Sequence, residues 1–250
     1  MKIKYLLTIF LIAAVVAAAS GCLCEKSADN KPVEITVSAA ASLQDVMKDA
    51  GAQFQKYHPE VKINFNFAAS GVLEKQIEQG APVDLFASAS QKEMNLLEEK
   101  GLIIKSTRTN FTRNKLVILA PSRLTIEELK NLDKIAIGDP TTVPAGRYAK
   151  TALENAGVYE ILKPKLIFAE HVRQVLDYVE REEVDAGFVY SSDTLKSNMS
   201  VSSINDSLYP PIVYPIGVIK DSRQPEISRQ FIEYIQSSEG QIILQKYGFG

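Results

Sequence analysis

Cysteine and histidine are both rare in this chain of 250 residues. The two cysteines, Cys22 and Cys24, stand together near the N-terminus, so no disulfide framework is available to the fold. The two histidines, His58 and His171, are far apart in the sequence, and neither a Gly-x-Ser-x-Gly elbow nor a zinc-spaced cluster occurs. A hydrolase would need a nucleophile and a base that this chain does not offer. We therefore expect no catalytic residue, no enzyme activity and no cofactor.

A block of basic residues is missing as well. Lysine and arginine together number 28, aspartate and glutamate number 30, and the formal net charge is −2. Because no basic stretch is interleaved with aromatic residues, we expect no nucleic-acid partner. Hydrophobic residues make up 46% of the chain and no low-complexity tract interrupts them, which predicts a folded domain with a sizeable core.

The one long apolar run lies at the N-terminus. A short positive start at residues 1–4 precedes an unbroken apolar run at residues 5–19, and small residues follow. This order is typical of a secretory signal peptide, which we place at residues 1–21. A buried core helix is the alternative. As a membrane span the run is too short, since about 20 apolar residues are needed.

The segment Ala-Ser-Gly-Cys at residues 19–22 resembles a lipobox, in which the cysteine is lipidated and becomes the new N-terminus. Such motifs prefer leucine three residues before the cysteine, and Ala19 departs from that preference. Cys24 has no comparable context. We expect a lipid on Cys22 and a flexible polar tether over residues 22–32. The protein would then be an extracytoplasmic, membrane-anchored lipoprotein, in a periplasm or at a cell surface.

Short apolar runs alternate with amphipathic segments over the rest of the chain. Strand followed by helix, repeated, predicts an α/β protein with parallel sheets covered by helices on both faces. Glycines stop two of the helical patterns, at Gly101 and Gly157. The expected strands are residues 35–40, 61–67, 83–87, 116–119, 135–137, 166–168, 187–190 and 212–219, and the expected helices are residues 43–57, 72–79, 92–100, 147–155, 172–182 and 226–247.

Two polar breaks divide this pattern, at residues 110–114 and at residues 209–211. The run after the second break is long enough to cross between two lobes, and the last amphipathic segment can pack back on the first lobe. We therefore expect lobe 1 at residues 33–112 and 217–250 and lobe 2 at residues 113–216. Two crossings of the chain between the lobes would form a hinge beside a cleft.

Four turns from a strand into a helix are built of small or hydroxyl-bearing residues. They are residues 39–42, 68–71, 138–146 and 169–172. In open α/β sheets ligands bind beyond the carboxyl ends of the strands, and helix N-termini favour anions. The turns therefore predict an anion site, and each also has a plainer interpretation. Ser42 and Ser70 can be ordinary N-caps, Tyr190 half-buried packing, and His171 a surface residue in the first turn of a helix.

Four sequence blocks carry a resemblance to a known family. They are Ile35-Thr36-Val37 with Ala39-Ala40-Ala41-Ser42-Leu43, then Gly80-Ala81-Pro82-Val83-Asp84-Leu85-Phe86-Ala87-Ser88-Ala89, then Gly138-Asp139-Pro140 with Val143-Pro144-Ala145-Gly146, and Gly187-Phe188-Val189-Tyr190-Ser191-Ser192-Asp193. In this order and spacing they resemble the periplasmic molybdate-binding proteins (ModA) of ABC transporters, over nearly all of the chain from Glu34. The resemblance implies a two-lobed periplasmic-binding-protein fold of type II. Each lobe would be a doubly wound mixed sheet, with a two-segment hinge and the ligand cleft between the lobes.

The resemblance also implies which residues hold the ion, by contacts to molybdate oxygens and not by direct bonds to the metal. Hydroxyl and backbone N–H groups would come from two serines, backbone N–H groups from two residues at helix starts, and a phenolic hydroxyl from a tyrosine. These residues are Ser42, Ser70, Ala145, Val172 and Tyr190. His171 departs from the family, in which Asp or Asn is common at this position. Since a bound dianion favours a charged imidazole nearby, we expect affinity to improve modestly as the pH falls.

The function that this resemblance implies is capture of molybdate or tungstate and delivery to an ABC transporter permease, by a protein that we expect to be a monomer. Molybdate is a dianion that only accepts hydrogen bonds at neutral pH, and the inferred positions offer only donors. Phosphate keeps a proton near pH 7 and would need an acceptor in the site. Sulfate differs mainly in size and stays the alternative, and the sequence does not separate molybdate from tungstate.

Overall fold

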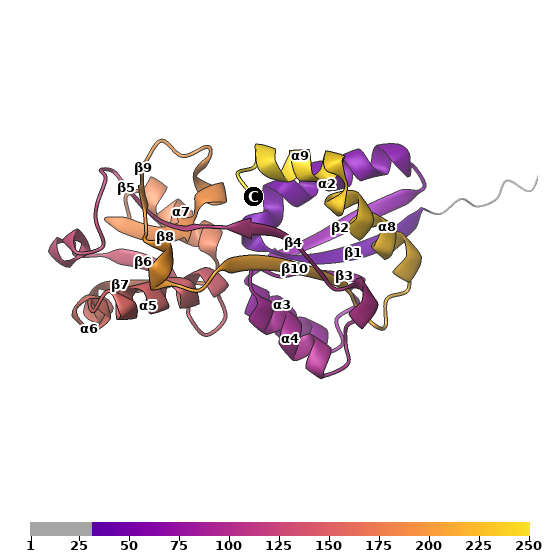
Figure 1. The fold of residues 1–250 in the computed structure, drawn as a ribbon, viewed down its shortest axis with the longest axis horizontal. Coiled ribbons are helices and arrows are strands. Elements are labelled where there is room, and N and C mark those ends of the chain that lie inside the picture. The colour runs from indigo at the N-terminus through magenta and orange to yellow at the C-terminus, as the bar shows by residue number, and fades with distance from the viewer. Residues whose placement is uncertain (1–31) are drawn as a thin grey trace, which may run out of the picture. The chain divides into compact units, whose positions relative to one another are not determined.

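Two five-stranded mixed sheets organise the protein (Figure 1). The computed structural model describes residues 32–250. The predicted signal peptide, Cys22 and the predicted tether before Pro32 lie outside the described residues. Within residues 32–250, no helix combines the length and the apolar character needed to cross a membrane.

The first sheet has the strand order β2-β1-β3-β10-β4. Its strands are β1 (Val33–Ala40), β2 (Val61–Ala68), β3 (Leu85–Ala87), β4 (Thr109–Asn114) and β10 (Ile212–Val218). Strand β1 pairs in parallel with β2 and β3, whereas β10 runs antiparallel to β3 and β4. The carboxyl ends of β1, β2 and β3 therefore meet at one edge of this sheet.

The second sheet has the strand order β7-β6-β8-β5-β9. Its strands are β5 (Leu116–Ala120), β6 (Ile135–Gly138), β7 (Leu166–Ala169), β8 (Ala186–Tyr190) and β9 (Ser200–Ser203). Strand β6 is parallel to β7 and β8, and β5 is antiparallel to β8 and β9. The central strands β5, β6 and β8 are fully buried, which agrees with their continuous apolar sequences.

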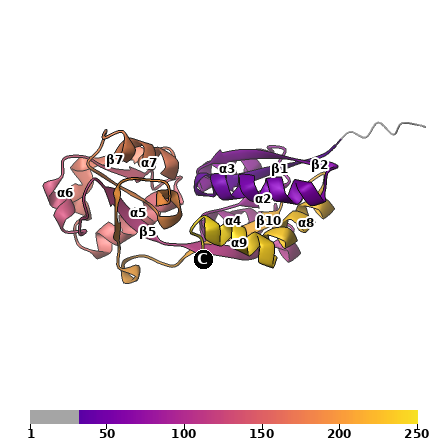
Figure 2. The ribbon, with the colours of Figure 1, turned by 90° about the horizontal axis from the view of Figure 1, so that it is seen from above.

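Helices cover both faces of each sheet (Figure 1). The first lobe has α3 (Ser70–Glu78) and α4 (Gln91–Glu99) on one face, and α2 (Gln44–Tyr57), α8 (Pro225–Gln236) and α9 (Ser238–Lys246) on the other. Figure 2 shows α8 and α9 beside α2, from the opposite end of the chain. The second lobe has α5 (Pro144–Asn155) and α6 (Tyr159–Leu162) on one face and α7 (Val172–Glu180) on the other. Two lobes of doubly wound mixed sheets confirm the predicted fold class.

Short 3₁₀ helices join several of these elements. They are η1 (Ala41–Leu43), η2 (Lys105–Thr107), η3 (Glu128–Asn131), η4 (Lys163–Lys165), η5 (Ser191–Thr194) and η6 (Asp206–Leu208). The first of them leads directly into α2, so the chain leaves β1 and begins to coil within one residue.

Two edge strands were not predicted from the sequence. Residues 110–114, interpreted above as a polar break, form most of β4, and the serine-rich strand β9 lies at the other sheet's edge. An edge strand faces solvent along one side, so polar residues are tolerated there and the apolar alternation that signals a strand is weak.

The last predicted helix, residues 226–247, is two helices. Ser237 has an extended backbone between α8 and α9, and its hydroxyl accepts a hydrogen bond from the N–H of Gly240 at 3.3 Å. A Cβ on Gly240 would lie 2.3 Å from the carbonyl oxygen of Tyr234, so the tight corner requires glycine. Helical periodicity continues across this corner, which is why the sequence pattern did not reveal it.

The chain passes between the sheets twice. Lys115 alone separates β4 from β5, and residues 204–211 join β9 to β10. The lobe limits expected at residues 113 and 216 fall inside β4 and β10, which pair with each other in the first sheet. Their pairing shifts register between Tyr214 and Pro215, where proline cannot donate to the ladder.

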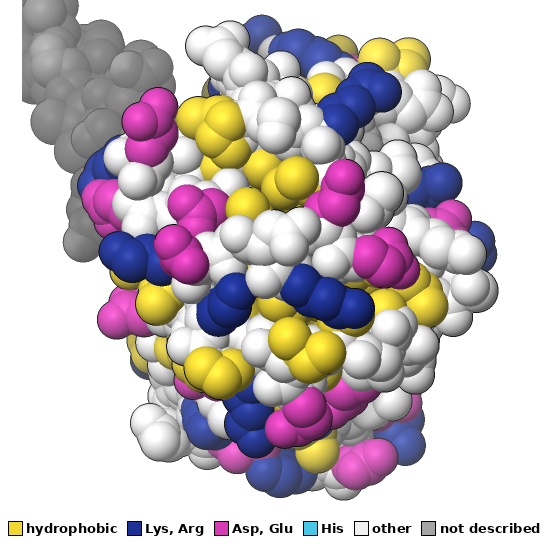
Figure 3. Space-filling view, turned by 90° about the vertical axis from the view of Figure 1, so that its left-hand side faces the viewer, with side chains coloured by type: hydrophobic (Ala, Val, Ile, Leu, Met, Phe, Trp, Pro, Cys, Tyr) yellow, Lys and Arg dark blue, Asp and Glu magenta, His cyan; other side chains and the backbone are white. Residues whose placement is uncertain are grey.

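The outer end of the second lobe shows how charge is spread on one face of the molecule. Lysine and arginine side chains alternate there with aspartate and glutamate, and no patch of one sign covers the face (Figure 3). This face therefore lacks the basic patch that nucleic-acid binding requires.

Candidate functional site

A small cavity lies where helix starts of both lobes meet. Its lining consists of small, hydroxyl-bearing and apolar residues, and most of them are buried. The lining residues are Ala40, Ala41, Ser42, Ala68, Ala69, Ser70, Ala89, Val143, Pro144, Ala145, His171, Val172 and Tyr190. All five residues predicted to hold the ion are among them, so the structure brings together segments up to 148 residues apart in sequence (42 to 190). Their contact with a ligand stays a prediction.

The backbone around the cavity presents N–H groups. Helix α3 begins at Ser70, α5 at Pro144 and α7 at Val172. The first N–H groups of an α-helix have no acceptor within the helix, and they carry the positive end of its dipole. Proline at the first position of α5 leaves Ala145 as the first residue of that helix with an N–H to offer. Three helix starts at one cavity favour a negatively charged guest.

Neither serine of the site caps its helix with its side chain. The residue before α3 is Ala69, and the Ser70 hydroxyl accepts a hydrogen bond from the N–H of Ala89 at 3.0 Å. The hydroxyl of Ser42 lies 3.0 Å from that of Tyr214. The interpretation of these serines as ordinary N-caps is therefore wrong. Both hydroxyls already have one partner and keep the capacity for a second.

Tyr190 ends strand β8 and is 1% exposed. Its hydroxyl has no hydrogen-bond partner within the described part of the chain. Burial raises the pKa of Tyr190 well above its usual range, so the hydroxyl keeps its proton and is a donor. An unpaired buried hydroxyl costs about 1–3 kcal/mol. This unpaired donor indicates that the cavity suits a ligand that accepts hydrogen bonds.

No lysine, arginine, aspartate or glutamate lines the cavity. His171, its one titratable side chain other than tyrosine, accepts a hydrogen bond at Nδ1 from the N–H of Gln174 at 3.1 Å and so caps α7. This cap uses a lone pair of Nδ1, and the dependence of affinity on pH stays a prediction. Among the described residues, no group of three or more His, Cys, Asp or Glu could hold a metal ion.

The lobes touch each other around the cavity. The N–H of Gly71 in α3 donates to the carbonyl of Thr142 in the second lobe at 3.0 Å, and a Cβ on Gly71 would lie 2.7 Å from that oxygen. The Nη2 of Arg147 in α5 lies 2.5 Å from the Oε1 of Glu93 in α4. These contacts hold the cleft closed.

Arg173 adds a second ion-pair contact between the lobes. It lies 3.1 Å from Asp45 of the first lobe and 2.9 Å from Asp193 of its own lobe. Burial raises the pKa of Asp193 to about 6, against the lowering effect of Arg173. Neither Arg147 nor Arg173 was predicted from the sequence. Both lie within the first turn of helices that carry a predicted site residue, and this position is the sequence signal that could have indicated them.

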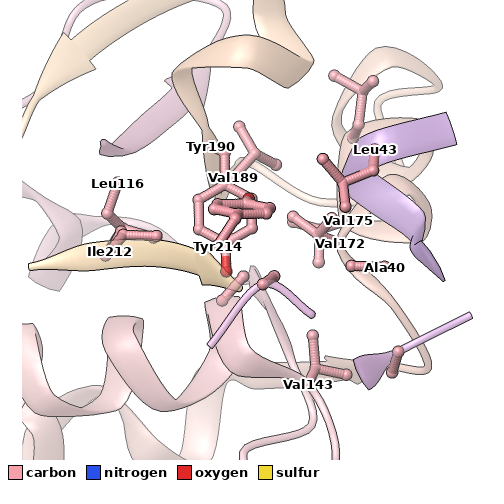
Figure 4. Close-up of a cluster of buried hydrophobic side chains, with 14 of the residues drawn as sticks. Ala40, Leu43, Leu116, Val143, Val172, Val175, Val189, Tyr190, Ile212 and Tyr214 are labelled. Carbon is pink, nitrogen blue, oxygen red and sulfur yellow. The ribbon is translucent and has the colours of Figure 1, made fainter. Parts of the chain in front are cut away.

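Tyr214 and Asn114 were also missed. The two tyrosine rings, Tyr190 and Tyr214, pack edge to face with centroids 5.8 Å apart beside the cavity (Figure 4). The Nδ2 of Asn114 lies 3.3 Å from the Tyr214 hydroxyl. Both residues come from the two strands that lead to the crossings, and no local sequence signal links either of them to Ser42.

Known proteins with similar sequences share this organisation. The profile of bacterial extracellular solute-binding proteins matches residues 35–250. YvgL of Bacillus subtilis, named as a proposed ABC transporter substrate-binding lipoprotein, is 38% identical over 97% of this chain and 95% of its own length. Molybdate-binding protein ModA of Escherichia coli is 38% identical over 86% of this chain and 88% of its own.

A solved structure adds the fold. The substrate-binding domain of a proposed molybdenum ABC transporter from Clostridium difficile is 39% identical, with a TM-score of 0.68 over 87% of this chain and 98% of that one. The sequence profile, the relatives and the solved structure agree on the family. The chain belongs to the bacterial extracellular solute-binding proteins and, within them, to the ModA family.

Proposed function

We propose that this protein captures molybdate or tungstate outside the cytoplasm and delivers it to an ABC transporter permease. The observation that carries the proposal is the buried hydroxyl of Tyr190, which within residues 32–250 is a donor without a partner, in a cavity lined by helix starts and by no charged side chain of that range. The names of the relatives from Escherichia coli and Clostridium difficile support the choice of ion and of transporter.

The cavity matches the chemistry of a fully deprotonated oxyanion. Such an ion accepts hydrogen bonds at every oxygen and donates none. Hydrogen bonds to a charged group are worth about 1.5–3 kcal/mol each, and association costs about 4–15 kcal/mol. The five predicted residues offer seven donors, two from each serine and one from each of the other three, and these would contribute roughly 10–20 kcal/mol without a lysine or an arginine in contact with the ion. No cofactor takes part in this chemistry.

Capture requires the lobes to move. The cavity volume is about 10 Å³, close to the smallest that holds one water molecule. An oxyanion therefore enters only after the lobes separate about the two crossings, at Lys115 and at residues 204–211. Closure then restores the contacts of Gly71, Arg147 and Arg173 across the cleft, and the ion gains donors from both sides.

A member of the bacterial extracellular solute-binding family acts outside the cytoplasm. We extend this to a lipid on Cys22 that holds the protein at the membrane near its permease. The lipoprotein named among the relatives, which aligns with 97% of this chain, supports the extension.

Calorimetry of the purified protein against molybdate, tungstate, sulfate and hydrogen phosphate tests the proposal. We expect molybdate and tungstate to bind with sub-micromolar dissociation constants and hydrogen phosphate to bind at least a hundredfold more weakly. Sulfate bound as tightly as molybdate would favour the wider class of unprotonated oxyanions. Tighter binding of phosphate than of molybdate would overturn the proposal.

A further inference from the structure

The direction of one proton decides what Ser42 offers to the ligand. Its hydroxyl lies 3.0 Å from the hydroxyl of Tyr214, and both side chains are almost fully buried. If Ser42 donates to Tyr214, a lone pair of Ser42 faces the cavity. If Tyr214 donates instead, the proton of Ser42 is free to point at the ligand. The two cases suit different oxyanions.

The amide of Asn114 has a fixed orientation. Its Oδ1 lies 2.9 Å from the backbone nitrogen of Lys115, and a backbone N–H can only donate. The hydroxyl of Ser191 also donates to Oδ1, at 3.0 Å. The other end of the amide is therefore the NH₂ group, which lies 2.8 Å from the hydroxyl oxygen of Ser192 and 3.3 Å from that of Tyr214.

The orientation of the Asn114 amide determines the direction of the hydrogen bond between Tyr214 and Ser42. An NH₂ group only donates, so the Tyr214 oxygen accepts at its contact with Asn114. The single proton of Tyr214 is then left for Ser42, its other partner. Burial raises the pKa of Tyr214 well above its usual range, so that proton is retained. Ser42 accepts from Tyr214, and its own proton is available to the ligand.

We infer that Asn114 and Tyr214 are positioning residues that fix Ser42 as a donor and thereby make the cavity select oxyanions without a proton. The inference rests on the proposed function. An ion without a proton, such as molybdate, finds only donors. Hydrogen phosphate brings a proton of its own, which meets the proton of Ser42 and finds no acceptor there.

Two substitutions test the relay. Tyr214→Phe removes the donor to Ser42, whose lone pairs become free to accept a proton from the ligand. Asn114→Asp places a carboxylate oxygen where the NH₂ group was, so Tyr214 donates to it and Ser42 donates to Tyr214. Both changes turn an acceptor toward the cavity. Tyr209→Phe is the matched control, since its hydroxyl contacts the N–H of Leu116 and the Asp206 carboxylate, away from the cavity.

The measurement is the ratio of the dissociation constants for hydrogen phosphate and molybdate at pH 8, obtained by calorimetric competition. Both ions are then predominantly dianions, so a general change in the charge of the site cancels in the ratio. We expect Tyr214→Phe and Asn114→Asp each to lower the ratio at least tenfold and Tyr209→Phe to leave it unchanged. Thermal melting without ligand shows which variants are folded. One folded variant, Tyr214→Phe or Asn114→Asp, is enough for the test.

The outcomes separate the two proposals. Wild-type protein that fails to bind molybdate overturns the proposed function, whatever the variants do. Wild-type protein that binds molybdate, together with a folded Tyr214→Phe or Asn114→Asp protein that keeps the wild-type ratio, overturns the relay alone. A ratio that falls in the variants, but falls equally when Ser42 is already alanine, also overturns it, because the relay acts only through Ser42.

Discussion

Tyr190 and Ser42 both line the cavity, yet their hydroxyls stand in different surroundings before any ligand binds. The hydroxyl of Tyr190 has no partner in the described part of the chain, whereas that of Ser42 is bonded to Tyr214. The resemblance to ModA groups both as ion-binding hydroxyls. Because their hydrogen bonding differs, the two residues should differ in how much they contribute to the stability of the unliganded protein and to ion binding.

Tyr190→Phe should therefore weaken molybdate binding without destabilising the unliganded protein. We expect a loss of about 1.5–3 kcal/mol in binding, the value of a hydrogen bond to a charged group. The unliganded protein should melt at the same temperature or slightly higher, because an unpaired buried hydroxyl is removed. Ser42→Ala should lower both the affinity and the melting temperature, since the proton of the Tyr214 hydroxyl loses its acceptor. Calorimetry and thermal melting of both variants check this, and a Tyr190→Phe protein with wild-type affinity would mean that the tyrosine does not touch the ion.

Glu74 is expected to make the stability of the unliganded protein fall as the pH rises. Its side chain is buried in α3, and burial, followed by the hydrogen bond and charge of Glu78, raises the pKa of Glu74 to about 7. Lys100 lowers this pKa and Glu93 raises it further. Since the unfolded carboxyl titrates near 4.5, the folded state binds the proton more tightly. The contribution is fully present below about pH 4.5 and is lost as the pH rises through 7.

Urea unfolding at pH 5 and pH 8 measures this loss, which we expect to be about 1–2 kcal/mol, as one unit of pKa shift is worth about 1.4 kcal/mol. Glu74→Gln should remove most of the difference. The exposed Glu99 on α4 supplies the control, and Glu99→Gln should leave the difference as it is. An equal pH dependence in wild-type and Glu74→Gln protein would contradict the assignment to Glu74.

At the scale of single residues, the sequence predicts site residues that lie near strand ends. It does not predict contacts that depend on strand register. The five predicted residues lie at the carboxyl ends of strands or in the helix starts that come after them, and parallel strands bring such positions to one edge. Tyr214 meets Ser42 across 172 residues of sequence. That contact depends on the pairing of β10 with β3 and β4 and on the register shift after Tyr214, neither of which has a local sequence signal.

At the scale of elements, helix α3 carries a backbone hydrogen bond between the lobes. Gly71 donates its N–H to Thr142, and there is no room for a Cβ beside that carbonyl. The sequence pattern predicts this helix from residue 72, with Gly71 in the turn of small residues before it. Its contact in the structure is with the other lobe.

Gly71→Ala should therefore favour the helix and oppose closure. Alanine is better than glycine in a helix by about 1 kcal/mol, so the unliganded protein should be as stable as wild type or more so. The added methyl group should push Thr142 away and weaken molybdate binding at least tenfold. Gly51→Ala in α2 is the contrasting control, since its Cβ would meet the Phe65 ring inside the first lobe and should affect stability only. Unchanged affinity of Gly71→Ala would show that closure does not need this approach.

The elements that the sequence missed or merged also have physical explanations. Strands β4 and β9 lie at sheet edges, where polar residues are tolerated, and α8 and α9 share one amphipathic period across the corner at Ser237. Buried strands such as β5 and β8 were recognised because burial on both faces demands an unbroken apolar run.

At the scale of the whole molecule, the two-lobed architecture followed from strand–helix alternation and the family resemblance. The expected lobe limits fall inside β4 and β10, which pair with each other, and the polar sequence of β4 does not mark it as a strand. The anchor is the other whole-molecule expectation. It concerns Cys22, outside the described residues.

Cys22→Ser should move the protein from the membrane fraction to the soluble extracytoplasmic fraction and leave molybdate affinity unchanged. The lipid would be attached well before the first strand, and the described residues that line the cavity begin at Ala40. Fractionation with immunodetection, and calorimetry of the released protein, measure the two effects. Cys24→Ser is the matched control and should stay at the membrane. Wild-type protein found entirely in the soluble fraction would contradict lipidation.

The donors around the cavity come in two sets on separate sheets. Ser42 and Ser70 belong to the first lobe, and Ala145, Val172 and Tyr190 belong to the second. Neither set alone can surround an ion, so under the proposed function a loaded carrier differs from an open, empty one in the spacing of its lobes. A permease that senses only the spacing of the two lobes could sort loaded carriers from empty ones without ever touching the cargo.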